Sequence, residues 1–485
     1  MRTLCAPLFA FVLSFSSLAV GAGHEFANLA DAKRVHGELL ALDFIHRSGE
    51  FRADDGVLTR FFMPPYAIMK YRGVEADLRE VPLGTQMTFV MLPDADGKLT
   101  QLVTTDDGQP ADAAQLKKFR EFTEKRGIAG WIDKTDGSTV TLTFFSGDPV
   151  AFQTAYGELL AVGKGGKLCV ANDELRTWNP GVDGEGCSIT EVNKVPTECF
   201  GSSGVQITVK VSNMLEGFRR GRVVRVFLTG WKVQDQFYGE SLMGYGFGRM
   251  LNQELVENVA KEYPEQFPFR TDYSNAKLPW YQLKEGVKPP PFSEHVVFGE
   301  LVEADVKNGG GQFLAELGGE KVGFTLTKPH AIKYLGADVR FEQLPKGQRY
   351  RFHLYQDEKG AFTRVSFISD EFSHCSANAT TARITAVNGK RLHIAWQLPL
   401  VKDYNGDMQR PEDIGSAILA VGDATRVWKG DQQVKLADVK AGDVVLFNRT
   451  GELPGRPSSC ADLWIGEETH KMVTEKLRKP VAGKK

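Results

Sequence analysis

The sequence predicts a mainly β protein built from small barrel-like modules that are duplicated along the chain. Three observations support this prediction: 50 of the 485 residues are glycine, apolar residues alternate in short runs, and two long segments resemble each other in register. Abundant glycine is typical of many short strands joined by tight turns. Internal similarity over such lengths indicates a repeated structural unit.

The N-terminus has the pattern of a secretory signal peptide. Arg2 is followed by an apolar run from Leu4 to Val20, and small residues surround a cleavage point after Ala22. The run is too short for a permanent membrane span, and no later stretch reaches the required length. We therefore expect residues 1–22 to be removed and the mature protein to be secreted or periplasmic.

Composition limits the choice of partners. The 59 basic and 61 acidic residues leave a formal net charge of −2, so no global field attracts phosphates or anionic lipids. Nucleic acid is therefore not an expected partner. Roughly 460 residues remain after cleavage, which suffices for about three or four domains.

One unit, called A, occurs twice. The string VHGELLALD from Val35 returns as VFGELVEAD from Val297, and residues Lys70–Asp107 match Lys333–Asp370 without a gap. Each copy has a Pro-x-Gly before an alternating run and a glycine-containing turn after it, which predicts a hairpin. We expect the A units to be small closed barrels, because closure removes exposed strand edges.

A second unit, called B, also occurs twice. GWIDKTDGSTVTLTFF from Gly130 resembles ARITAVNGKRLHIAWQ from Ala382, and LEGFRRGRVVRVF from Leu215 resembles LADVKAGDVVLFN from Leu436. Each first string has a two-residue turn signal between alternating strands. The predicted order is therefore A-B-A-B, with modules A1 (35–108), B1 (127–243), A2 (295–371) and B2 (380–470).

Two strings support a family resemblance. LADVKAGDVVLF with ATRVWKGDQQV before it, and LPxGxxxxFxLxxDxxGxxT, resemble the closing strands of OB-like small barrels found in secreted bacterial modules of uncharacterised function. The resemblance extends over about half of the chain and implies tandem OB-like barrels. Such barrels carry many unrelated binding tasks, so the resemblance implies no particular function.

Two segments interrupt the β pattern. Leu116, Phe119 and Phe122 have helical spacing and Gly127 follows them, which predicts a linker helix at 109–126. A second helix is expected from Met250, followed by a Pro-rich connector, so that residues 244–294 divide the two halves. Residues 471–485 are expected to form a basic tail.

No catalytic or metal-binding motif stands out. The chain has no G-x-S-x-G, H-E-x-x-H or C-x-x-C string, and His36, matched by Phe298 in the other copy, is not repeated. A calcium-like loop from Asp403 has Met408 where glycine is required. We expect no cofactor and no metal, and we favour a protein that is not an enzyme.

The cysteines suggest disulfides in an oxidising compartment, although spacing alone leaves their connectivity open. Cys187 and Cys199 would close a small loop. Cys375 and Cys460 would join the start of the last module to its end, and Cys169 would then be left over.

The candidate ligand-binding residues lie around an insertion in B1 at residues 177–204. Trp178 offers a stacking face, and Arg219, Arg220 and Arg222 offer an anion preference. We expect an exported, non-catalytic binding or scaffold protein whose partner is a polysaccharide or another envelope protein. The alternative is a hydrolytic enzyme with a site assembled at a module junction.

Overall fold

The computed structural model is mainly β, as the sequence predicts. None of the helices it describes is long and apolar enough to cross a membrane. The expected signal peptide and nearly all of the expected 244–294 linker lie outside the described residues. Those residues are 31–44, 47–63, 67–93, 97–144, 157–172, 178–181, 186–195, 204–214, 218, 223–233, 294–357, 359–397, 401–402, 408–409 and 413–479.

Module A1 contains a closed five-stranded barrel. Its strands pair in the closed order β1-β2-β3-β7-β6-β1, and β3 and β7 are parallel. Alternation places Phe51 and Phe89 inside, where their rings stack with centroids 3.9 Å apart. The elements are β1 (Lys33–Asp43), β2 (Ser48–Ala53), β3 (Leu58–Phe62), β4 (Ile68–Tyr71), β5 (Val74–Glu75), the 3-10 turn η2 (Leu78–Glu80), β6 (Gln86–Pro93) and β7 (Leu99–Asp106).

Module A2 has the same strand order as A1, and its long strand β17 takes the place of both β3 and β4. Its interior also contains a stacked pair, Phe313 and Phe352, with centroids 4.1 Å apart. The elements are β15 (His295–Asp305), β16 (Gly310–Ala315), β17 (Lys321–Tyr334), β18 (Ala337–Asp338), η4 (Phe341–Gln343), β19 (Arg349–Gln356) and β20 (Phe362–Ser369).

Strand registers also agree between A1 and A2. The pair Gly37 and Ala53 in A1 has the same place as Gly299 and Ala315 in A2, and a bulge follows Leu39 in one and Leu301 in the other. Both η turns precede the fourth barrel strand. The matching positions on the outer faces of the two barrels can therefore be compared residue by residue.

Module B2 shares a sheet with A1 although the two lie at opposite ends of the chain. Strand β25 pairs with β1, with Leu42 opposite Ser416, and this pairing contributes to a 14-stranded sheet. Within B2, β26 and β29 are parallel. The elements are β21 (Thr381–Asn388), β22 (Arg391–Gln397), β23 (Val401–Lys402), β24 (Met408–Gln409), β25 (Gly415–Ala420), β26 (Arg426–Lys429), β27 (Gln432–Val434), η5 (Leu436–Asp438), β28 (Val444–Arg449) and β29 (Cys460–Ile465).

Module B1 differs from B2 in strand order, contrary to the expected shared framework. Its strands close as β8-β9-β13-β12-β10-β14-β8, and every described pairing is antiparallel. The similar strings cover one hairpin and one further strand of each module, and any half-buried strand has such alternation. The strands are β8 (Ile128–Asp136), β9 (Thr139–Phe144), β10 (Lys167–Asn172), β11 (Trp178–Asn179), β12 (Cys187–Val195), β13 (Gly204–Lys210) and β14 (Val223–Leu228).

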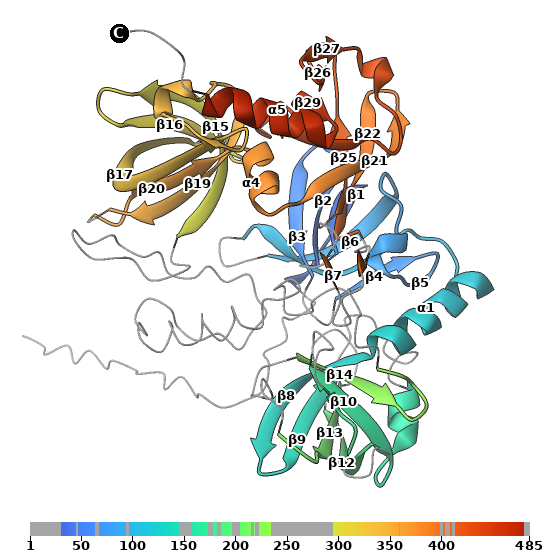
Figure 1. The fold of residues 1–485 in the computed structure, drawn as a ribbon. Coiled ribbons are helices and arrows are strands. Elements are labelled where there is room, and N and C mark those ends of the chain that lie inside the picture. Colours follow the sequence, from blue (N-terminus) through green and yellow to red (C-terminus); the bar gives the residue numbers. More distant parts are fainter. Residues whose placement is uncertain are drawn as a thin grey trace, which may run out of the picture.

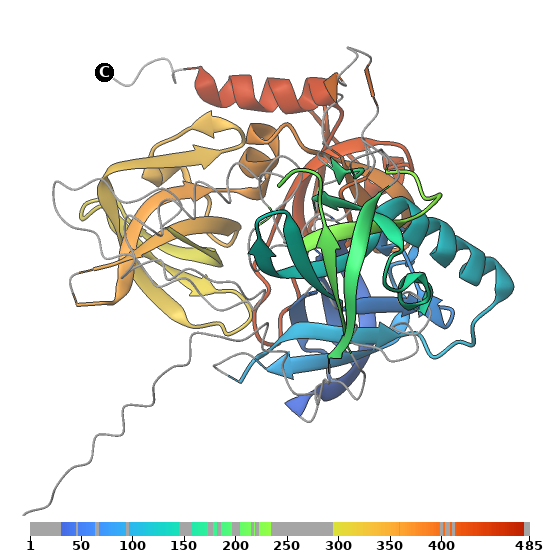
Figure 2. The same ribbon diagram turned by 90° about the horizontal axis from the view of Figure 1, so that it is seen from below.

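Helix α1 (Ala113–Arg126) lies where helical spacing predicts the linker helix. The Asp112 side chain accepts a hydrogen bond from the Gln115 amide at its start, and Gly127, with φ of 78°, ends it. Figure 2 shows α1 at the margin of the molecule, beyond the strands of A1.

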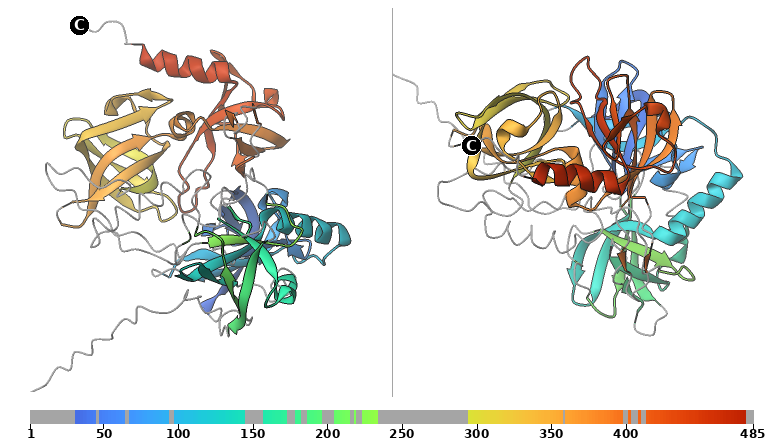
Figure 3. Two further views of the ribbon diagram at one scale, coloured as in Figure 1. Left: turned by 60° about the horizontal axis from the view of Figure 1, so that its bottom comes forward. Right: turned by 45° about the horizontal axis from the view of Figure 1, so that its top comes forward.

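Residues 471–478 of the expected basic tail at 471–485 belong to a helix. Helix α5 (Glu467–Arg478) packs Val473 and Leu477 against the A2 core, and the Thr474 hydroxyl donates to the Leu335 carbonyl at 2.9 Å. This spacing of two apolar residues gives the charged segment one buried stripe. Figures 1 and 3 show α5 lying alongside both A2 and B2.

Candidate functional site

The residues predicted to bind a ligand are only partly described. Trp178 lies on β11 of B1 with 37% of its surface exposed. The neighbouring Asn179 is buried, and its amide bonds to the Ser212 hydroxyl and the Asn213 carbonyl, which fixes β11 in place. Arg219, Arg220 and Arg222 lie outside the described residues, so no site joining them to Trp178 can be described.

The expected disulfide between Cys375 and Cys460 is absent, and both are free thiols. The reason is geometric: Cys375, on α4 (Glu371–Ala377), packs in the A2 core, whereas Cys460 packs in the B2 core. Burial raises the pKa of both thiols. Cys187 is a buried free thiol inside the B1 barrel, and its expected partner Cys199 lies outside the described residues.

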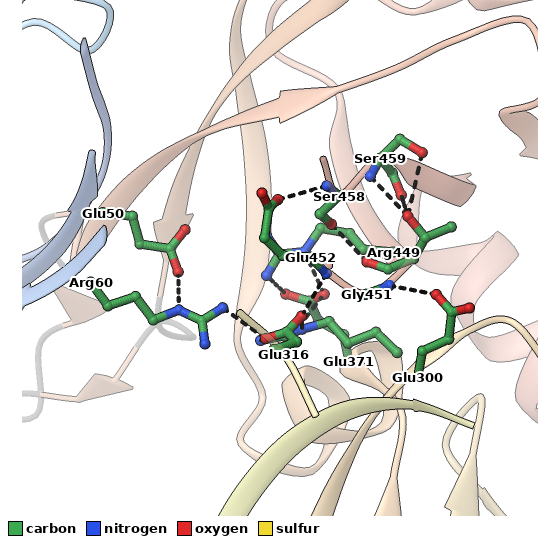
Figure 4. A network of polar contacts seen from close by, with 12 residues as sticks. Glu50, Arg60, Glu300, Glu316, Glu371, Arg449, Gly451, Glu452, Ser458 and Ser459 are labelled. Atoms are coloured by element: carbon green, nitrogen blue, oxygen red, sulfur yellow. Dashed lines mark hydrogen bonds and ion pairs between the residues drawn. The ribbon is translucent and has the colours of Figure 1, made fainter. Parts of the chain in front are cut away.

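Charged side chains of A1, A2 and B2 instead meet at one junction (Figure 4). On A1, Glu50 and Arg60 are opposite each other on β2 and β3, so both side chains lie on the same outer face. Arg60 Nε donates to Glu50 Oε1 at 2.7 Å, and its Nη2 donates to Glu316 Oε2 at 2.7 Å. Glu316 follows β16, so this contact joins A1 to A2.

Within A2, Glu316 forms an ion pair with a second arginine. Arg349 of β19 donates from Nε to Glu316 Oε1 at 2.6 Å and from Nη2 to Oε2 at 3.1 Å. The same guanidinium lies over the Phe298 ring, 4.1 Å from its centroid, which adds a cation–π contact. The Glu316 side chain is only 3% exposed and that of Arg349 only 8%, so the pair is desolvated.

B2 contributes a bidentate pair of its own. Arg449 of β28 donates from Nε and Nη2 to the two carboxylate oxygens of Glu371, at 2.9 and 3.0 Å. Glu371 begins α4, directly after the last strand of A2. A paired carboxylate and guanidinium of this geometry fix each other's orientation as well as their distance.

The loop after β28 ties B2 to both A modules. Glu452 accepts from Arg52 of A1 at 3.2 Å and from the Ser458 amide at 2.6 Å. Glu300 of A2 is paired with Arg456 and accepts from the Gly451 amide at 3.2 Å.

Electrostatics favour the charged forms of Glu316 and Glu50. Burial alone would raise the pKa of Glu316, but Arg349 and Arg60 outweigh it and lower the pKa to about 2. Burial would also raise the pKa of Glu50, but Arg60 and Arg449 lower that pKa below the ordinary value. A hydrolase acid needs the opposite, a carboxyl whose pKa is raised so that it holds its proton near neutral pH.

Charge is balanced across the junction. Each carboxylate has an arginine partner, which leaves no unpaired charge in this set to attract a substrate. Within the described part of the chain, no three His, Cys, Asp or Glu side chains are grouped to hold a metal ion. The members are Glu50, Glu300, Glu316, Glu371 and Glu452 with Arg52, Arg60, Arg349, Arg449 and Arg456.

Reasoning from the sequence missed this junction, because its members come from three modules. One signal was present in the comparison of the two A modules. A1 has Glu50 and Arg60 where A2 has Gln312 and Gly323 in the same register, so a charged pair is particular to one copy. Comparison with known protein families and with curated proteins finds no match to this chain.

Proposed function

We propose that the protein is an exported, non-catalytic scaffold or binding protein made of duplicated OB-like barrels. The agreement of strand order, register and stacked phenylalanines supports a duplication that produced A1 and A2. B2 has a comparable order with its own parallel pair, so we extend the OB-like assignment to it. B1 is a barrel of different topology, so the duplication that we propose does not include it.

The observation that supports the scaffold function most is the partly buried, charge-balanced junction. Its arginine–carboxylate pairs and the β1–β25 pairing hold A1, A2 and B2 in one orientation. Fixed modules keep their outer faces at constant spacing, and a preorganised surface loses less conformational entropy when it binds an extended ligand. This arrangement favours an envelope polysaccharide or another envelope protein as the partner.

Trp178 supports the polysaccharide version. Its exposed indole stands on a hydrogen-bonded strand of B1, and such a ring can stack on the apolar face of a sugar. The expected export into the cell envelope places polysaccharides within reach of the protein.

The experiment is a binding screen of the mature protein against a glycan array and against sedimented peptidoglycan. Supernatants of the same incubations are assayed for new reducing ends. The proposal expects retention on at least one polysaccharide and no reducing ends. Trp178→Ala should weaken that retention, with Trp428→Phe in B2 as the matched aromatic control.

The rival function is a hydrolase at the module junction, favoured by the convergence of five carboxylates there. That function predicts release of reducing ends that is lost in Glu371→Gln. Release of this kind would overturn the non-catalytic proposal, and failure to bind any polysaccharide would overturn the glycan-binding version.

A further inference from the structure

The outer faces of A1 and A2 are used differently. In A1, Glu50 and Arg60 occupy the β2–β3 face and are engaged at the junction. In A2, the same register holds Gln312 and Gly323, opposite each other on β16 and β17. Figure 1 shows β17 on the side of A2 that faces away from A1. The β2–β3 face of A1 therefore contributes to the junction, whereas Gln312 and Gly323 on the corresponding face of A2 do not.

Small side chains leave the A2 face open. A Cβ atom built on Gly323 would meet no other atom within 4 Å, and Gly323 and Thr325 are both exposed. An extended ligand could thus lie directly against the strand backbones.

Cations surround this open strip. Arg364 of β20 lies beside Thr325 in the parallel pairing, and Lys321 begins β17 at one end of the strip. Lys328 lies further along β17, past Thr325. None of these three cations has an ion-pair partner among the described residues, where the ion pairs of A2 involve other side chains.

The cations at these two positions, Lys321 and Arg364, are specific to A2. Leu58 and Gln101 of A1 stand at the register positions of Lys321 and Arg364. A structural requirement of the barrel would appear in both copies, so the barrel fold does not require these cations.

Most of the carboxylates near the strip are already engaged. Asp357 accepts from the Lys359 and Ala361 amides at 2.9 Å each, and Asp305 accepts from the Asn308 side chain at 2.6 Å. Those bonds lower the pKa of both carboxyls and hold them in their own turns. Glu303, opposite Gln312, and Glu320, next to Lys321, are exposed acids that remain near the strip.

We infer that the outer face of β16, β17 and β20 in A2 binds an acidic polysaccharide, with Arg364 and Lys321 meeting its carboxylates. The inference rests on the proposed binding function and names its ligand class and site. Charge complementarity supplies the attraction, since guanidinium and ammonium groups pair with carboxylates. Gly323 supplies the close approach of the sugar chain to the sheet.

The test titrates polygalacturonate oligomers into the mature protein by calorimetry at low salt. Gly323→Glu places a negative side chain in the open strip and should weaken binding at least tenfold. Gly422→Glu is the matched control, because a Cβ atom at Gly422 in B2 also meets nothing within 4 Å. It should change affinity less than twofold.

A second variant guards against a folding defect. Lys321→Gln combined with Arg364→Gln removes two exposed or half-buried cations without adding bulk, and should also weaken binding at least tenfold with an unchanged melting temperature. Affinity of the wild type should fall with added salt.

Three results would overturn the inference. If both variants bind polygalacturonate as tightly as the wild type, the binding site lies elsewhere, and the proposed function is unaffected. Equal affinity for neutral dextran would exclude an acidic ligand class. Tighter binding of a single-stranded oligonucleotide than of polygalacturonate would assign the face to nucleic acid.

Discussion

Replacing Glu316 by glutamine should lower the free energy of unfolding of the joined modules by about 3 kcal/mol. The magnitude follows from the pKa of Glu316, which its two arginines hold at about 2 instead of the ordinary 4.5. A difference of that size corresponds to about 3 kcal/mol of stabilisation of the charged form. Loss of one partner from a buried ion pair costs about 3–5 kcal/mol in other proteins, which agrees.

The same pair predicts a pH dependence. Because the folded pKa of Glu316 lies below the unfolded one, its contribution is fully present above pH 4.5 and is lost as the pH falls from 4.5 toward 2. The amide introduced by Glu316→Gln does not titrate, so the difference in stability between the wild type and this variant should shrink over that window.

Urea unfolding followed by tryptophan fluorescence gives the measurement, with the transition midpoint compared at pH 7 and pH 3. Glu320→Gln is the control, since Glu320 is an exposed carboxylate four residues further along the same loop. The reasoning is refuted if the two variants shift the midpoint equally at pH 7. It is also refuted if the effect of Glu316→Gln is the same at pH 3 as at pH 7.

Three further predictions concern the cores. Asn448 donates to buried Asp370 at 2.7 Å and accepts from the Phe372 amide at 3.0 Å. Asn448→Ala should therefore lower the free energy of unfolding, measured by chemical denaturation, by about 2–5 kcal/mol. An effect under about 1 kcal/mol would contradict this. Cys375 and Cys460 should both be alkylated after unfolding without reductant, and a linked peptide in mass spectrometry would refute the free-thiol assignment. Phe51→Ala and Phe313→Ala should each cost about 3–5 kcal/mol, because both rings are fully buried at the same barrel position, and a harmless substitution in either would show that the two cores differ.

The barrels of A1 and A2 were accessible to sequence reasoning because their signals are local. A strand needs alternating apolar residues and a hairpin needs a turn residue, and both lie within a few positions of each other. The same signals occur twice in the sequence, at Lys70–Asp107 and Lys333–Asp370.

The junction was not accessible for the opposite reason. Arg60 and Glu316 are 256 positions apart, and neither stands in a pattern that marks it as a partner of the other. The disulfide expected between Cys375 and Cys460 failed in a related way. The two cysteines flank the last module in the sequence, but their positions do not show which core each side chain enters. Cys375 enters the A2 core, whereas Cys460 enters the B2 core.

The pairing of β1 with β25 has a consequence for synthesis of the chain. Gly415 is made roughly 370 residues after Asp43, its partner in the sheet, which takes on the order of 20–70 s at ~5–20 residues per second. Until then the C-terminal part of β1 has no β25 beside it, and an unpaired strand edge is a template for association with other chains. The first module of a nascent chain therefore has an open strand edge at Ala41–Asp43 until the last module emerges.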